Sequence, residues 1–182
     1  MRVSKGYRSM AETGIGKRIM IAGCPGSGKS TLAVRLQEIT GLPLYHLDSI
    51  WWKADRTHIS RSEYDGRLDE IIQKDSWIID GDYSRTYEPR IAACDTIIFL
   101  DLTEEECLEG IRDRIGKERA DMPWTDLSLD PALERQVLDY RSEERPRLLA
   151  LIDRYPGKRL LVFHTREEIG EWLSGLEREK DV

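Results

Sequence analysis

Residue types that would indicate particular protein classes are scarce in this sequence. It has three cysteines in 182 residues, and neither these nor the three histidines have the spacing of a metal site. The odd number of cysteines favours free thiols in a reducing compartment, so we expect a cytoplasmic protein. No hydrophobic run approaches about 18 residues, which excludes a membrane-spanning helix and disfavours a membrane partner.

The sequence also lacks an excess of positive charge. Its formal net charge is −6, with 28 Lys and Arg against 34 Asp and Glu. Proteins that grip nucleic acid usually carry a basic surface, so nucleic acid is a disfavoured partner. Residues 1–16 contain no hydrophobic signal-peptide core, and we expect a flexible leader there. Residues 17–182 suit a single domain, and the choice between monomer and homodimer stays open.

The most informative motif is a glycine-rich stretch, GCPGSGKS at residues 23–30, which fits the phosphate-binding P-loop pattern G-x-x-x-x-G-K-[ST]. Glycines let backbone N–H groups turn toward phosphate oxygens, Lys29 supplies a cation, and Ser30 offers a ligand to Mg²⁺. An apolar segment at 18–22 and a helical pattern at 29–40 flank the loop, as the motif requires. We therefore predict ATP and Mg²⁺ as cofactors, with Lys29 also catalytic. The predicted nucleotide-binding residues here are Gly23, Cys24, Pro25, Gly26, Ser27, Gly28, Lys29, Ser30 and Thr31.

Apolar segments of strand length alternate with helical patterns along the chain. Strands are expected at 18–22, 43–47, 77–79, 96–100 and 159–163, and capping boxes at Ser60, Thr103 and Thr165 predict helix starts. Asp130 followed by Pro131 predicts one long helix that continues to about residue 155. This alternation predicts an α/β fold with a parallel sheet and helices on both faces. Ligands of such folds bind beyond the carboxyl ends of the strands.

Carboxylates follow three of the predicted strands. Asp80 suits a metal-binding role through water beside Ser30, and Asp101, after the strand at 96–100, is its rival. Asp48 could accept the proton of an attacking hydroxyl, or it could bind a sugar hydroxyl without taking part in chemistry. Trp52 could stack on a planar acceptor, although adjacent tryptophans also commonly serve as packing residues.

A polar loop after Asp80 offers further groups for a second substrate. Asp82 could bind a hydroxyl or an amine, and Arg85 could hold an anionic group of the acceptor. Tyr83, which lies between Asp82 and Arg85, is also predicted to bind the substrate. A solvated loop is the alternative interpretation of the same residues.

Basic residues flank a polar, irregular segment at about residues 112–129, which we call the lid segment. Arg112, Arg114 and Arg119 could close over the transferring phosphoryl group and stabilise its negative charge. Arg141 and Arg145, expected one turn apart on the next helix, could complete this cluster. A solvated helix face with local ion pairs is the alternative.

With these residues laid out, the chain resembles the adenylate-kinase-related P-loop kinases, and most closely their DNA topology modulation protein, or FlaR-like, subfamily. The matching stretches are IMIAGCPGSGKST (19–31), YHLDSIWW (45–52), DSWIIDGDYSRT (75–86), DTIIFLD (95–101) and RLLVFHTR (159–166). The resemblance implies a three-layer P-loop NTPase fold with a five-stranded parallel sheet of order 2-3-1-4-5 and a short lid. It also implies that Asp80 reaches metal-bound water, that Arg85 contacts the acceptor, and that Thr165 and Arg166 border the adenine of ATP.

These observations lead to two hypotheses of different classes. The first is an ATP- and Mg²⁺-dependent kinase for a small molecule, such as a nucleotide, a nucleoside or a similar hydroxylated metabolite. AMP itself is not indicated, because LDSIWW at 47–52 replaces the usual adenylate kinase entry into the acceptor helix. The alternative is an ATP-binding regulatory protein that acts on a macromolecular partner with a link to DNA.

Overall fold

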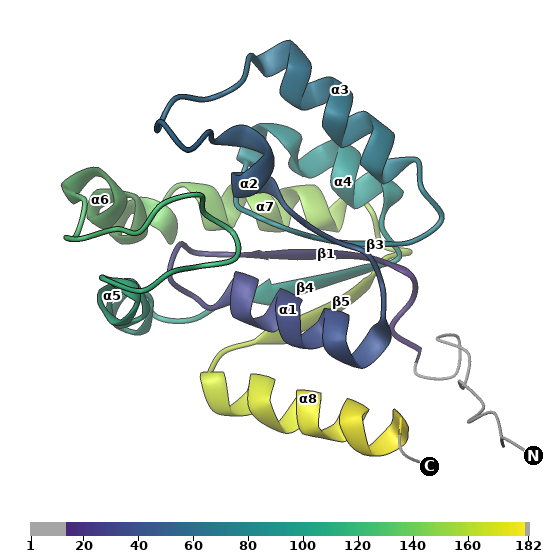
Figure 1. Cartoon of the computed structure of the whole chain (residues 1–182). Helices are drawn as coiled ribbons and strands as arrows, with labels where there is room; N and C mark the ends of the chain where they lie inside the picture. Colours follow the sequence, from purple (N-terminus) through teal and green to yellow (C-terminus); the bar gives the residue numbers. More distant parts are fainter. Residues whose placement is uncertain (1–13, 181–182) are drawn as a thin grey trace, which may run out of the picture.

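A parallel β-sheet forms the centre of the computed structural model, which describes residues 14–180 (Figure 1). Of the expected leader, residues 1–13 lie outside the described part, and Ile15 is buried with its carbonyl accepting a hydrogen bond from Thr96. The sheet has the predicted order β2-β3-β1-β4-β5, and all its strand pairs are parallel. The strands are β1 (Arg18–Gly23), β2 (Leu44–His46), β3 (Trp77–Asp80), β4 (Thr96–Leu100) and β5 (Arg159–Phe163).

Helices cover both faces of the sheet and complete the three predicted layers. One face carries α1 and α8, and the other carries α3, α4 and α7, while α5 and α6 lie toward the carboxyl ends of the strands (Figure 1). Among residues 14–180, no helix is long and apolar enough to cross a membrane. The helices are α1 (Lys29–Thr40), α2 (Leu47–Trp51), α3 (Arg61–Ile72), α4 (Tyr87–Ala93), α5 (Glu104–Arg114), α6 (Pro131–Tyr140), α7 (Glu144–Asp153) and α8 (Arg166–Lys180).

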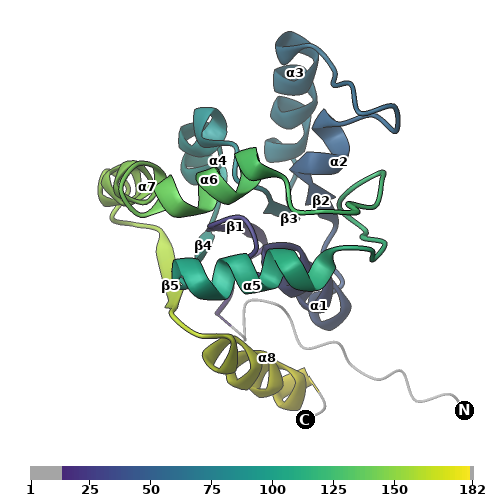
Figure 2. The ribbon, with the colours of Figure 1, turned by 90° about the vertical axis from the view of Figure 1, so that its left-hand side faces the viewer.

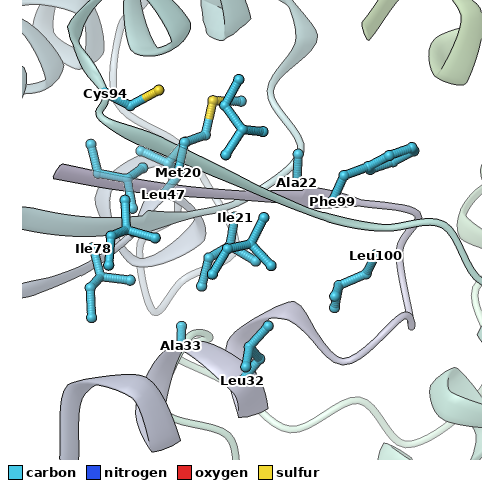
Figure 3. Packing of buried hydrophobic residues seen from close by; sticks show 14 of the residues in the cluster. Met20, Ile21, Ala22, Leu32, Ala33, Leu47, Ile78, Cys94, Phe99 and Leu100 are labelled. Atoms are coloured by element: carbon cyan, nitrogen blue, oxygen red, sulfur yellow. The ribbon is translucent and has the colours of Figure 1, made fainter. Parts of the chain in front are cut away.

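The central strands are buried on both faces, which explains why they read as continuous apolar runs. Every residue of β3 and β4 is buried. Figure 3 shows that Met20 and Ile21, neighbours in β1, point to opposite faces, with Ile21 directed toward Leu32 and Ala33 of α1. The sheet therefore holds the carboxyl ends of β1 and β3 in fixed positions beside each other.

The single long helix predicted after Asp130 is wrong, because the chain forms α6 and α7 with a turn at 141–143 between them. Pro146 explains the break: in a continuous helix its ring would clash with the carbonyl of Ser142, and it has no N–H to donate. Proline is tolerated where it stands, in the first turn of α7. As a consequence, Arg141 and Arg145 do not lie one turn apart on a single helix.

The region after β2 also differs from the expectation. The strand ends at His46, and α2, which was not predicted, begins at Leu47, so that Asp48 lies in the first turn of a helix. Gly81, with φ 128°, follows β3, and a Cβ there would lie 2.7 Å from Cβ of Leu47. The sequence pattern also did not predict α4 and the 3₁₀ turn before it, Ser84–Thr86. The close approach at Gly81 brings α2 directly against the end of β3.

Candidate functional site

A cavity of about 920 Å³ lies at the carboxyl ends of the strands. The P-loop after β1 borders it, together with the segments after β2 and β3, the lid segment and the start of α6. Figure 2 shows α5, α6 and the chain that joins them lying across this edge of the sheet. The volume is near the upper end of the roughly 300–1,000 Å³ typical of ligand sites, which leaves room for a nucleotide and a second small molecule.

The P-loop has the backbone conformation that its glycines allow. Gly26 and Gly28 have φ of 82° and 95°, values that strongly favour glycine. A Cβ at Gly26 would lie 2.1 Å from the carbonyl oxygen of Cys107, so α5 packs directly on the loop. No side chain caps α1, which begins at Lys29, and its first N–H groups are therefore available to an anion.

Two basic side chains lie along the P-loop. Nζ of Lys29 donates hydrogen bonds to the carbonyl oxygens of Gly23 at 2.8 Å and Cys24 at 2.9 Å. An ammonium group has three N–H donors, so one is left for a phosphate oxygen. Arg166, at the start of α8, donates to the carbonyl oxygen of Gly26 at 3.2 Å and also lines the cavity. Thr165 instead accepts a hydrogen bond from an N–H of α8.

The hydroxyl of Ser30 is held by a carboxylate that sequence reasoning missed. It donates to Oδ2 of Asp121 at 2.9 Å, and Arg119 donates to both oxygens of the same carboxylate, at 3.0 and 2.9 Å. Burial would raise the pKa of Asp121, but the Arg119 guanidinium and the Ser30 hydroxyl outweigh it and lower that pKa. A charged carboxylate therefore stands beside the P-loop serine. Because Asp121 follows no strand, no pattern in the sequence points to it.

The two carboxylates considered for the metal role have different surroundings. Asp80 is 2% exposed and lines the cavity, and its Oδ1 lies 2.6 Å from Nδ1 of His46. Burial lowers the pKa of His46, but the interaction with Asp80 outweighs this and raises it. Asp101 accepts two 2.7 Å hydrogen bonds from Arg145 and does not line the cavity.

Asp48 lies in the cavity wall and is held there by Tyr83. The Tyr83 hydroxyl donates to Oδ1 of Asp48 at 2.8 Å, and both residues line the cavity. Burial raises the pKa of Asp48, although the Tyr83 hydrogen bond opposes this effect. A carboxylate with a raised pKa is a stronger proton acceptor, as a general base requires.

Three tryptophans line the same part of the cavity. Trp51 is stacked on His58, with ring centroids 4.4 Å apart, which ties it into the surrounding packing. Trp52 meets Trp124 of the lid segment edge to face at 5.5 Å. Sequence reasoning included Trp52 but not Trp124, which lies far away in the chain and has no motif around it.

A buried arginine shapes the loop after β3. The guanidinium of Arg90 donates to the carbonyl oxygens of Thr86, Gly81 and Tyr83 at 3.0, 3.0 and 2.9 Å. Asp82, in this loop, lines the cavity, and its Oδ1 is buried with no hydrogen-bond partner in the described part of the chain. Burial raises the pKa of Asp82 to about 6. The loop is thus fixed by Arg90 and presents an unsatisfied carboxylate.

The predicted site residues divide into those that line the cavity and those that do not. Arg85 is among the second group because it forms an ion pair with Asp65 at 2.6 Å. The predicted residues that line the cavity are Pro25, Gly26, Gly28, Lys29, Ser30, Thr31, Asp48, Trp52, Asp80, Asp82, Tyr83, Arg114, Arg119 and Arg166. Those outside the lining are Gly23, Cys24, Ser27, Arg85, Arg112, Arg141, Arg145 and Thr165.

Within residues 14–180, no group of three or more His, Cys, Asp or Glu side chains is arranged to hold a metal ion. Mg²⁺ that binds with a nucleotide does not need such a cage, because phosphates and waters fill most of its coordination positions. Ser30, Asp80 and Asp121 all present oxygen atoms to the cavity. These three residues fit a nucleotide-bound Mg²⁺.

Comparisons with solved structures identify the fold. A shikimate kinase from Acinetobacter baumannii in complex with shikimate has a TM-score of 0.57 and 17% sequence identity, covering 91% of this chain and 95% of that chain. A gluconokinase from Sinorhizobium meliloti 1021 has a TM-score of 0.53 and 16% identity, covering 91% and 94%. At these identities the likeness shows a shared fold, the P-loop fold of two small-molecule kinases.

Sequence comparisons give one family and no individual relative. No curated protein matches the chain. The model of a P-loop family described as AAA domain matches residues 19–123, which is more than half of the chain and includes the P-loop, Asp80 and Asp121. The chain therefore belongs to this AAA domain family.

Proposed function

We propose that the protein is an ATP- and Mg²⁺-dependent kinase that transfers a phosphoryl group to a hydroxyl of a small molecule. The observation that carries this proposal is the shared cavity, which is lined by the P-loop and also by Asp48, Trp52 and Asp82. Direct transfer requires both substrates in one site that excludes most water. The fold shared with a shikimate kinase and a gluconokinase supports this class of reaction.

The P-loop side binds the triphosphate of ATP. Its backbone N–H groups and the amino end of α1 attract the phosphates, and Lys29 adds its remaining N–H donor. Arg166 lies over the loop and contacts the nucleotide from the side of α8. These groups are in place before ATP arrives, so little reorganisation opposes binding.

Three oxygen-bearing side chains serve the metal. When bound, Mg²⁺ neutralises phosphate charge and polarises the γ-phosphoryl group. The Ser30 hydroxyl directs its proton to Asp121, which leaves the lone pairs of its oxygen free for a cation. Asp80 acts through water, as its position at the end of β3 suggests.

Asp48 acts on the acceptor. As the acceptor hydroxyl oxygen bonds to the γ-phosphorus, the bond to the bridging β,γ-oxygen breaks, ADP leaves and Asp48 takes the hydroxyl proton. The raised pKa of Asp48 favours this transfer, and the hydrogen bond from Tyr83 fixes the carboxylate. The same hydrogen bond leaves Oδ2 as the oxygen that faces the acceptor.

Lid arginines stabilise the transferring charge. Arg114 lines the cavity, so its guanidinium can bind a phosphoryl oxygen. Arg119 is paired with Asp121 and positions that carboxylate. Arg112 lies outside the cavity lining and would reach the phosphates only after the lid moves.

The proposal is tested by incubating the pure protein with Mg²⁺-ATP and a pool of nucleosides, nucleotides and small hydroxylated metabolites, and following ADP release. We expect ADP release that depends on the pool and is lost in Lys29→Ala, and splitting the pool would then name the acceptor. Tight ATP binding with the same slow ADP release with and without the pool would contradict a kinase. That result would favour the ATP-binding regulatory alternative.

A further inference from the structure

The acceptor side of the cavity, formed by residues 48–52, residues 80–83 and Trp124, carries one sign of charge. Asp48, Asp80 and Asp82 contribute three carboxylates there, and the sequence of these segments contains no basic residue. The basic residues of the cavity wall come from the P-loop, α1, α5, the lid segment and α8; they are Lys29, Arg35, Arg114, Lys117, Arg119 and Arg166. The electrostatic environment on the acceptor side therefore favours a positively charged ligand.

Among these three carboxylates, Asp82 has an oxygen that lacks a hydrogen-bond partner in the described part of the chain. Its Oδ1 is buried and lacks a hydrogen-bond donor within residues 14–180. Lys29 and Arg90 favour the charged form of Asp82, but Lys29 and Arg90 donate their hydrogen bonds to backbone carbonyls. Leaving a buried carboxylate short of hydrogen-bond donors costs free energy, and Asp82 lines the cavity, so its carboxylate would bind a donor on a ligand strongly.

Two aromatic residues in the same cavity wall suit the same kind of ligand. Trp52 and Trp124 line the cavity with their rings edge to face. The faces of indole rings attract ammonium groups. The guanidinium of Arg56 already lies 5.5 Å from the ring centroid of Trp124, which shows that this ring accepts a cation.

Arg85, which the sequence predicted to hold an anionic group of the acceptor, forms an ion pair with a residue of the protein instead. Arg85 pairs with Asp65 on α3 and does not line the cavity. An anionic group on the acceptor side would thus face three carboxylates and would not have the Arg85 guanidinium as a partner. Bound ATP would add further negative charge to the same cavity, of which Mg²⁺ would neutralise only a part.

We propose that the acceptor is an amine-bearing alcohol, for example of the amino-sugar or amino-alcohol class. Its ammonium group binds Asp82 and the rings of Trp52 and Trp124, and its hydroxyl lies at Asp48. This assignment rests on the proposed kinase function and adds the substrate class. Alcohols that carry a carboxylate or a phosphate are rejected by the acidic wall.

The test uses matched skeletons that differ in charge: D-glucosamine, D-glucose and D-gluconate, and 3-amino-1-propanol, 1,3-propanediol and 3-hydroxypropionate. One arm measures ADP release with Mg²⁺-ATP. The other measures binding by tryptophan fluorescence in the presence of a non-hydrolysable ATP analogue. We expect the amine of at least one series to give the highest rate and the tightest binding. Asp82→Asn should weaken amine binding at least about tenfold, because a hydrogen bond to a charged group is lost.

Asp69→Asn is the matched control, because Asp69 lies exposed on α3 and outside the cavity lining. Preference for a neutral or anionic member in both series, equal binding of all members, or binding of none would overturn the proposal. Equal loss of amine binding in Asp82→Asn and Asp69→Asn would overturn it too. Amine-selective binding without ADP release from any compound would uphold the ligand class and contradict the kinase function, so the two failures are distinguishable.

Discussion

The P-loop side and the acceptor side of the cavity are built in different ways. The P-loop side comes from consecutive residues, 23–31, whose glycine conformations, helix start and lysine are set by local sequence. The acceptor side joins α2, the loop after β3 and the lid segment through contacts such as that of Tyr83 with Asp48. In the proposed kinase, phosphate binding is therefore a local property of the chain, whereas acceptor choice is a property of its tertiary structure.

Removing the P-loop lysine should have the largest effect on activity, because it removes a charge from the P-loop side of the cavity. We expect Lys29→Ala to lower acceptor-dependent ADP release by at least about 100-fold, since a preorganised charge at the phosphates is lost. Lys17→Ala is the matched control, because Lys17 is exposed and lies outside the cavity lining. A Lys29→Ala protein with full activity would rule out the mechanism.

Asp121 of the lid segment accepts a hydrogen bond from Ser30 of the P-loop and so connects the two sides of the cavity. Its substitution should have an intermediate effect. Asp121→Asn removes the charge that orients the Ser30 hydroxyl and pairs with Arg119. We expect the Mg²⁺ concentration needed for half-maximal ADP release to rise about 10–100-fold, as for other partners of metal-binding side chains. Asp139→Asn is the control, because Asp139 lies exposed on α6 and outside the cavity lining. An unchanged Mg²⁺ dependence would exclude Asp121 from the metal site.

The smallest effect that we expect is the change in stability caused by substituting Asp82. Because the pKa of Asp82 is raised from 3.8 to about 6 on folding, the folded protein binds more protons than the unfolded chain between these values, and stability falls as pH rises through them. Asp82→Asn should therefore raise the free energy of unfolding by about 1–2 kcal/mol at pH 7.5. The gain should shrink toward pH 4.5, as measured by urea unfolding. A gain that is equal at both pH values would contradict the buried charge.

The sequence predicted well the sheet, its layers and the P-loop. The helices on both faces of a parallel sheet and the P-loop flanked by β1 and α1 are confirmed, because continuous apolar strands and a motif of fixed spacing leave few alternatives. The strand order, which the resemblance to P-loop kinases implied, is confirmed too. The break between α6 and α7 was missed, although Pro146 provides a signal for it.

The acceptor side could be predicted only in part. Asp48, Trp52 and Asp82 were found because they follow strands, whose carboxyl ends meet at one edge. Asp121, Trp124 and Arg90 were not, because their positions depend on how the lid segment and α4 fold back onto that edge. Such long-range contacts leave no periodic pattern in the sequence.

The most direct test of a two-sided kinase site is to measure Asp48→Asn for both functions, the Kd of Mg²⁺-ATP and the rate of acceptor-dependent ADP release. Asp48 is proposed to serve the acceptor, and the hydrogen bond that its side chain accepts comes from Tyr83, outside the P-loop. The account therefore predicts a rate at least about 100-fold lower with a Kd unchanged within about twofold. An unchanged rate would remove Asp48 from the chemistry. A loss of ATP affinity as large as the loss of rate would contradict the division of the cavity into two sides.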